Sequence, residues 1–143
     1  MEETYMIEWY WVIAIMVFAH IIEDFHIQGI LAKMKQRDWW YDQYAEVSHK
    51  HPDADMSDIM DKYGSDFQVA LIVHGFEWAF IVGIPLMLMY GLTLGGFCAM
   101  MLMASIHCMI DDQKCNAFRI NLIIDQALHL VQIIIYYLMW VML

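Results

Sequence analysis

Histidine and aspartate recur along the chain in pairs that are four residues apart. The pairs are His20 with Asp24, His107 with Asp111, and Asp125 with His129. Two residues four apart lie on the same face of an α-helix, separated by about 6 Å along its axis. Neutral imidazole nitrogens and carboxylate oxygens are both ligands of divalent metal ions. Each pair therefore predicts a helix that presents two candidate metal ligands on one face.

The order of the residues in each pair indicates that the pairs meet in space. Histidine comes first in the first two pairs, and aspartate comes first in the last. If the helices alternate in direction appropriately, this order brings every aspartate toward one end and every histidine about one turn deeper. His74, in the remaining apolar stretch, falls at a similar depth. The predicted set of metal ligands is His20, Asp24, His74, His107, Asp111, Asp125 and His129.

This set predicts a divalent cation as cofactor, with zinc as the first expectation and manganese or iron as alternatives. Six or seven mixed ligands exceed one tetrahedral zinc site. They fit one ion with surrounding hydrogen-bonding groups, or two ions about 3.5–4 Å apart. The set contains no thiolate, which favours a Lewis-acid site over a closed structural one. The amides of Gln28, Gln126 and Gln132 are candidates for the surrounding groups or for substrate binding.

Two further residues are candidates for catalytic roles. Glu77 lies almost one turn beyond His74 on the same helix face, where it could act as a general base or as a further ligand. Lys114 lies almost one turn beyond Asp111, where its ammonium group could neutralise a substrate phosphate. His26 does not share the face of its neighbours, and we expect it at a membrane interface.

Four apolar stretches must position these side chains. The chain has 143 residues, of which 62% are hydrophobic and 17% are charged. The stretches cover about residues 6–28, 67–90, 94–111 and 119–143, each near the ~20 residues that a helix needs to cross a membrane. The sequence therefore predicts an all-α polytopic membrane protein, a single domain over 1–143 folded as an antiparallel four-helix bundle. The cysteines are expected as free thiols: Cys98, Cys108 and Cys115.

The positive charges predict the orientation in the membrane. All of them lie between the first and second stretches or between the third and fourth: Lys33, Lys35, Arg37, Lys50, Lys62, Lys114 and Arg119. The positive-inside rule then places both connections in the cytoplasm and both termini outside the membrane. Residues 1–8 carry no basic region typical of a cleaved signal. A net charge of −10 argues against nucleic acid as a partner.

The segment 33–66 is the one sizeable part expected outside the lipid. Within it, Asp55 and Gly64 predict the start and the end of a short helix. Trp39 and Trp40 suggest that the segment follows the membrane interface. The neighbouring histidines, His49 and His51, are expected in solvent-exposed loop.

The motifs resemble those of a known family. They are His20-xxx-Asp24-Phe25-xx-Gln28, His74, His107-xxx-Asp111-xx-Lys114 and Asp125-Gln126-xx-His129. This pattern is similar to the bacterial and phage membrane family catalogued as domain of unknown function 3307, over almost the whole chain. The long acidic segment 33–66 looks like an elaboration of the family pattern. The HxxxD pairs are also distantly similar to those of membrane-bound metal-dependent hydrolases, a likeness that implies a reaction class by analogy.

Three functions are compatible with this pattern. The first is a metal-dependent hydrolase that acts on a lipid-associated or phosphoester substrate from the cytoplasmic side. The second is a non-enzymatic membrane adaptor with a structural metal site and a protein partner at segment 33–66. The third is a pathway for metal ions or protons, against which the apolar outer half of every helix argues. A homo-oligomer is compatible with each of them.

Overall fold

A computed structural model describes residues 2–51, 53 and 55–143, with side chains from residue 9 onward. The acidic stretch considered for a signal sequence, residues 1–8, lies outside the described side chains. The described residues form helices and no strand. The helices are α1 (Glu2–Ile22), the π-helix η1 (Glu23–Ile27), α2 (Leu31–Met34), α3 (Arg37–Lys50), α4 (Met56–Tyr63), α5 (Asp66–Tyr90), α6 (Leu94–Cys115) and α7 (Leu122–Met142).

Four helical segments are long and apolar enough to cross a membrane. They are Trp9–Ile27, Met56–Tyr90, Leu94–Cys115 and Leu122–Met142. These segments match the four predicted stretches, although their ends differ. α6 continues to Cys115, so Lys114 lies in its last turn and not in the connection where the sequence placed it. α7 begins at Leu122, where the Asn121 side chain accepts a hydrogen bond from the Ile124 amide and caps the helix.

The first long helix does not remain α-helical to its end. At Glu23 it changes to the π-helix η1, in which the Gln28 amide donates to the Glu23 carbonyl at 3.2 Å. A π-turn widens the helix by one residue and is often found at functional sites. Here the change falls within the first predicted ligand motif.

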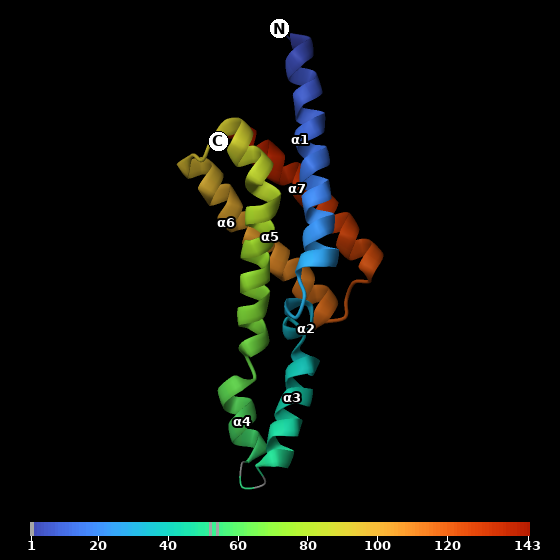
Figure 1. Ribbon diagram of the computed structural model, residues 1–143, viewed down its shortest axis with the longest axis vertical. Helices are drawn as coiled ribbons and strands as arrows, with labels where there is room; N and C mark the ends of the chain where they lie inside the picture. Colours follow the sequence, from blue (N-terminus) through green and yellow to red (C-terminus); the bar gives the residue numbers. More distant parts are fainter. Residues whose placement is uncertain (1, 52, 54) are drawn as a thin grey trace.

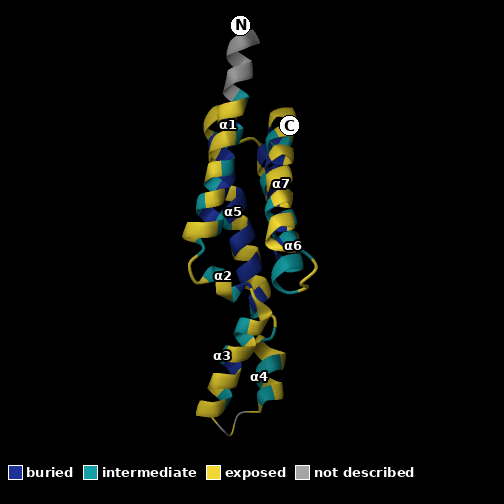
Figure 2. Cartoon of the chain, turned by 90° about the vertical axis from the view of Figure 1, so that its right-hand side faces the viewer, coloured by how far each residue is buried: buried dark blue, intermediate teal, exposed yellow. Residues whose placement is uncertain are grey.

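The buried core lies in the half of the long helices that contains both chain ends. α5 is the central helix and contacts α1, α6 and α7, and Figure 2 shows buried positions along its length. The core side chains include Met16, Trp78, Leu86, Met103 and Tyr136, which are all 0–1% exposed. Large apolar side chains cover much of the outer surface as well. Such a surface is what a helix bundle presents to lipid.

α5 packs tightly against α6 at Gly75, next to His74. A Cβ atom on Gly75 would lie 2.3 Å from Cys108 Sγ and 2.7 Å from the Ala104 carbonyl oxygen. The backbones can therefore approach this closely because residue 75 has no side chain.

Replacing Gly75 with alanine is expected to destabilise the protein. Overpacking costs roughly 1–3 kcal/mol, and the higher helix propensity of alanine offsets at most about 1 kcal/mol of this. Thermal unfolding in detergent micelles would measure the effect. Ser105→Ala is the control, because the Ser105 hydroxyl is exposed and bonds only to the Met101 carbonyl of its own helix. A Gly75→Ala protein as stable as this control would contradict the close helix contact.

Segment 33–66 folds into a helical hairpin. α3 and α4 lie side by side and extend beyond the four long helices, away from both termini (Figure 1). The Tyr44 hydroxyl on α3 donates to the Tyr63 carbonyl at the end of α4. The predicted short helix is confirmed, because Asp55 caps α4 through the Ser57 amide and Gly64 follows its last residue.

Two expectations about this segment are corrected. α3 was not predicted, and it takes in His49, which was expected in a loop. Trp39 and Trp40 suggested that the hairpin would lie across the end of the bundle, along the membrane interface. Instead, it projects along the direction of α5 (Figure 1). Trp40 instead donates to the Met34 carbonyl at 2.6 Å, which fixes the start of α3 against α2.

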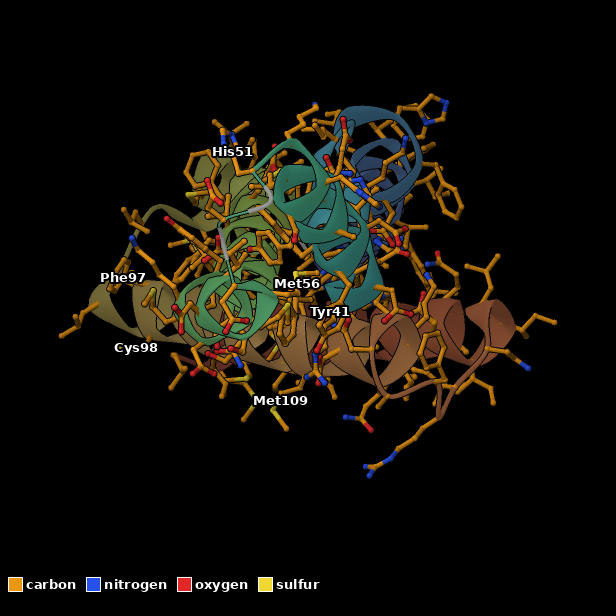
Figure 3. All side chains as sticks on the ribbon, turned by 90° about the horizontal axis from the view of Figure 1, so that it is seen from below. Tyr41, His51, Met56, Phe97, Cys98 and Met109 are labelled. Carbon is orange, nitrogen blue, oxygen red and sulfur yellow. The ribbon has the colours of Figure 1, made fainter. Side chains whose placement is uncertain are left out.

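The three cysteines are free thiols, as predicted. Cys98 is exposed, and Figure 3, which views the side chains from the α3–α4 end, shows Cys98 and Met109 at the outer surface of α6. Cys108 donates to the Leu71 carbonyl across the contact between α5 and α6.

Candidate metal centre

The seven predicted ligands all come from the four long helices, and six are essentially buried. The side chains of His20, His74, His107, Asp111, Asp125 and His129 are 0–1% exposed, and that of Asp24 is 7% exposed. Buried ionisable groups are costly and need partners. The seven residues have different partners, and these partners indicate different roles.

Among the described side chains, His107, Asp111 and His129 form the group of possible ligands whose three members are all buried. Their donor atoms lie within 4.8 Å of one another. His129 Nε2 is 3.3 Å from Asp111 Oδ1, and His107 Nε2 is 3.8 Å from Asp111 Oδ2. We call these three residues the central triad. Its spacing suits an ion that binds each atom at about 2.0–2.2 Å.

A neighbouring amide prepares His129 for metal binding. Gln132 Nε2 donates to the Met103 carbonyl at 2.7 Å, which directs Gln132 Oε1 toward His129 Nδ1 at 3.3 Å. Because Oε1 can only accept, the Nδ1 atom carries the proton and the Nε2 lone pair is free. His129 Nε2 is buried and makes no hydrogen bond to the described residues. Metal-binding histidines are commonly oriented in this way through their second nitrogen.

Trp78 and the two triad histidines form a stack. The Trp78 ring lies 4.3 Å from the His107 ring at an interplanar angle of 17°. The His107 and His129 rings are also 4.3 Å apart, at 30°. This stack fixes the ring planes against the apolar core and closes the centre on that side.

His74 lies beside the central triad. Its Nε2 atom is 3.0 Å from His107 Nε2 and 3.1 Å from Asp111 Oδ2. Asp24 Oδ1 is 3.7 Å from the same nitrogen, and Asp24, His74 and His107 form a second group within 4.8 Å. α5 and the π-turn of the first helix therefore both reach the triad.

Gln126 connects three of the predicted ligands. Its Nε2 atom donates to Asp24 Oδ2 and to Asp125 Oδ2, both at 3.1 Å. Its Oε1 atom faces His20 Nε2 at 3.2 Å. Gln28 adds a further donor to Asp24, at 2.9 Å. The two glutamines therefore hold the carboxylates in place, as expected of groups around a site.

His20 differs from the expectation. Trp78 Nε1 donates to His20 Nδ1 at 2.8 Å, so that nitrogen is an acceptor. The Nε2 atom then carries the proton and donates to Gln126 Oε1. Both ring nitrogens are engaged by protein groups, so His20 acts as a positioning residue for Gln126 and Trp78, and not as a free ligand.

Asp125 and Lys114 form an ion pair at 2.8 Å. Asp125 Oδ1 is 3.5 Å from His129 Nε2, but Asp125 belongs to none of the groups of three possible ligands among the described side chains. The Lys114 side chain is 30% exposed, so its ammonium group lies at the edge of the site. Asp125 is thus a neighbour of the triad that holds Lys114.

The sequence reasoning did not identify two buried charges in the site. Lys35, placed in the soluble segment, is 5% exposed and donates to Asp111 Oδ2. Burial alone would lower the pKa of the Lys35 amine, but the Asp111 carboxylate outweighs burial and leaves this pKa raised. Glu23 is fully buried and lies 3.0 Å from His74 Nδ1. Its position three residues after His20, on the same helix face, was the available signal.

The buried charges of the site do not balance. Four carboxylates (Glu23, Asp24, Asp111 and Asp125) face two ammonium groups, those of Lys35 and Lys114. This leaves two negative charges in a poorly solvated environment, unless histidines or carboxylates take up protons. A divalent cation has the charge that is missing.

Glu77 does not lie with the central triad. It groups with Glu23 and His74, and its side chain is partly exposed. Glu77 does lie beside His74, as its spacing predicted, and its role as a general base or as a further ligand stays a prediction.

One family model matches the chain over residues 55–143, and its description is "Protein of unknown function (DUF3307)". The chain belongs to this family. No curated protein and no solved structure matches it. The DUF3307 match includes α5, α6 and α7 and thus the whole central triad. The match is shorter than the resemblance, which was expected over almost the whole chain. It begins at residue 55 and so does not include the motif from His20 to Gln28.

Proposed function

We propose that this DUF3307 protein binds a divalent cation at His107, Asp111 and His129. The observation that carries the proposal is the buried Nε2 atom of His129, which makes no hydrogen bond to the described residues and lies 3.3 Å from Asp111 Oδ1, while Gln132 Oε1 faces the other ring nitrogen. Asp24, which has a carboxylate oxygen within 4.8 Å of a His107 nitrogen, lies close enough to add a ligand, and His74 Nε2 lies 3.1 Å from Asp111 Oδ2 as a neighbouring hydrogen-bond donor. Zinc is the first expectation, and manganese or iron also accept this nitrogen and oxygen set.

We further propose that the protein is a hydrolase for a lipid-associated phosphoester. A bound divalent ion would polarise a phosphoryl oxygen and activate water. Lys114 supports this reading, because its ammonium group is held at the partly exposed edge of the site by Asp125 and keeps further N–H groups for a substrate phosphate. Gln126 donates to the same Asp125 oxygen that accepts from Lys114.

We propose a bacterial inner membrane as the location, with both termini outside. Two observations support this orientation. In Figure 1, the α3–α4 hairpin and the α6–α7 connection, which carry the cations, lie toward the lower end of the molecule. Both termini lie toward the upper end. The core around Trp78, Leu86 and Tyr136 closes the outer half with apolar side chains. That core also argues against an ion or proton pathway through the bundle.

A membrane adaptor with a structural metal is the second candidate function. The pairing of Lys35 with Asp111 favours it, because a ligand already held by a buried lysine suits a static site. In that case the projecting α3–α4 hairpin is the surface for a protein partner.

Hydrolysis of a fluorogenic lipid phosphoester in detergent micelles tests the enzymatic proposal. We expect activity that chelation removes and zinc or manganese restores. Lys114→Gln should raise KM by roughly 10-fold, since one hydrogen bond to a charged group contributes about 1.5 kcal/mol or more. Lys62→Gln, an exposed change on α4, is the control. Metal-loaded protein without activity toward phosphoesters would overturn the hydrolase and favour the adaptor.

A further inference from the structure

We propose a second divalent-cation position, formed by Glu23 of η1 and by His74 and Glu77 of α5. One atom from each of these residues lies within 4.8 Å of the other two. The position shares no ligand with the central triad, so it does not rest on the ion proposed there. Two carboxylates and one imidazole suit manganese, iron or zinc better than calcium or magnesium.

Glu23 is the strongest evidence for this position. Its side chain is 0% exposed, and neither carboxylate oxygen makes a hydrogen bond to any described residue. An ionised carboxylate in such a place is strongly unfavourable without a counter-charge. The π-turn directs this carboxylate into the contact between the first helix and α5. The cost of placing it there indicates that something binds it.

His74 offers a nitrogen to the same position. Its Nδ1 atom lies 3.0 Å from Glu23 Oε1 but lacks the alignment of a hydrogen bond, and it has no other partner among the described residues. Its Nε2 atom lies 3.1 Å from Asp111 Oδ2. When Nδ1 binds an ion, the Nε2 proton can be donated to Asp111, an arrangement of carboxylate, histidine and metal that is common in metal sites.

Glu77 completes the group and adds a second uncompensated charge. It follows His74 by three residues, so both side chains lie on one face of α5. Among the described side chains, no lysine or arginine forms an ion pair with Glu23 or Glu77, because the two ammonium groups of the site are taken by Asp111 and Asp125. A divalent ion bound here would offset Glu23 and Glu77, which leaves Asp24 as the carboxylate of the site that has no lysine or arginine partner among the described side chains.

A proton shared by the two carboxylates is the competing explanation. It would neutralise one charge without any metal. The two explanations differ in the number of ions bound per chain, which can be counted.

The test is the metal content of full-length protein in detergent, stripped by chelation, reloaded with manganese or zinc and desalted. We expect two ions per chain in the wild type and one in Glu77→Gln. Glu46→Gln should keep two, because Glu46 is exposed and bonds only to Lys50. His129→Ala should lose the ion of the central triad and keep the other. A wild type with one ion that Glu77→Gln also retains would overturn the second position and leave the central triad intact.

Glu23→Gln provides a measurement that does not depend on ion counting. The amide has the shape of the carboxylate without its charge, so the metal-free variant should be at least as stable as the metal-free wild type. Adding manganese or zinc should then raise its melting temperature less than that of the wild type, since ligand binding to the native state is lost at one position. Equal increases in the two proteins would contradict a cation bound by Glu23.

Discussion

Replacing Asp111 with alanine is expected to lower the free energy of unfolding of the metal-free protein by about 3–5 kcal/mol. Asp111 accepts a hydrogen bond from the ammonium group of Lys35, which is 5% exposed. Removing the carboxylate leaves this cation buried without a counter-charge. Chemical unfolding in detergent micelles, with chelator present throughout, separates this effect from the loss of a bound ion.

Lys35→Met provides the matched control for this prediction. Methionine has a similar length and no charge, so the variant carrying both Asp111→Ala and Lys35→Met should recover much of the stability lost by Asp111→Ala alone. Coupling between two residues in contact is commonly 0.5–3 kcal/mol, and roughly the upper end is expected for a buried pair. Strictly additive effects of the two substitutions would show that the ion pair does not hold α2 against α6.

Replacing His129 with alanine is expected to weaken binding of the first divalent ion by more than roughly 100-fold, because even groups that only orient a ligand contribute 10–100-fold. The reason is the loss of His129 Nε2, a buried imidazole nitrogen that makes no hydrogen bond to the described residues and lies 3.3 Å from Asp111 Oδ1. Competition with a fluorescent chelator would measure the affinity. Gln132→Leu should lower the affinity for the same ion by about 10-fold, because it removes only the contact that orients the His129 ring.

His26→Ala is the control for these two variants. His26 is exposed on η1 and makes no contact with the central triad. Its removal should leave the affinity unchanged. If His129→Ala binds the ion as tightly as His26→Ala does, then His129 is not a ligand.

The sequence predicted the long helices well because the need to bury backbone groups in lipid leaves a strong signal of about 20 apolar residues. Their ends were less certain. α6 continues through the polar residues Asp112 to Cys115, where hydropathy falls but the helical hydrogen bonds persist. α3 was missed because residues 37–50 are mostly polar and carry no apolar stripe.

The spacing of histidine and aspartate identified side chains that the fold does bring together, but it could not assign their roles. A spacing of four residues reports on one helix, whereas the roles depend on partners from other helices. Trp78 and Gln126 occupy both nitrogens of His20, and Lys114 occupies Asp125. Lys35 was overlooked because a lysine in a soluble segment gives no sign that the chain turns back into the site.

The most direct test of the central claim is the metal content of the purified wild-type protein and of His107→Ala, measured by elemental analysis after desalting in detergent. His107 lies in the central triad and is 0% exposed. We expect at least one zinc, manganese or iron ion per wild-type chain and one ion fewer in the variant, with both proteins folded by circular dichroism. Wild-type protein that binds no divalent ion after reloading, or a His107→Ala variant that retains the full content, would contradict a metal centre at His107, Asp111 and His129.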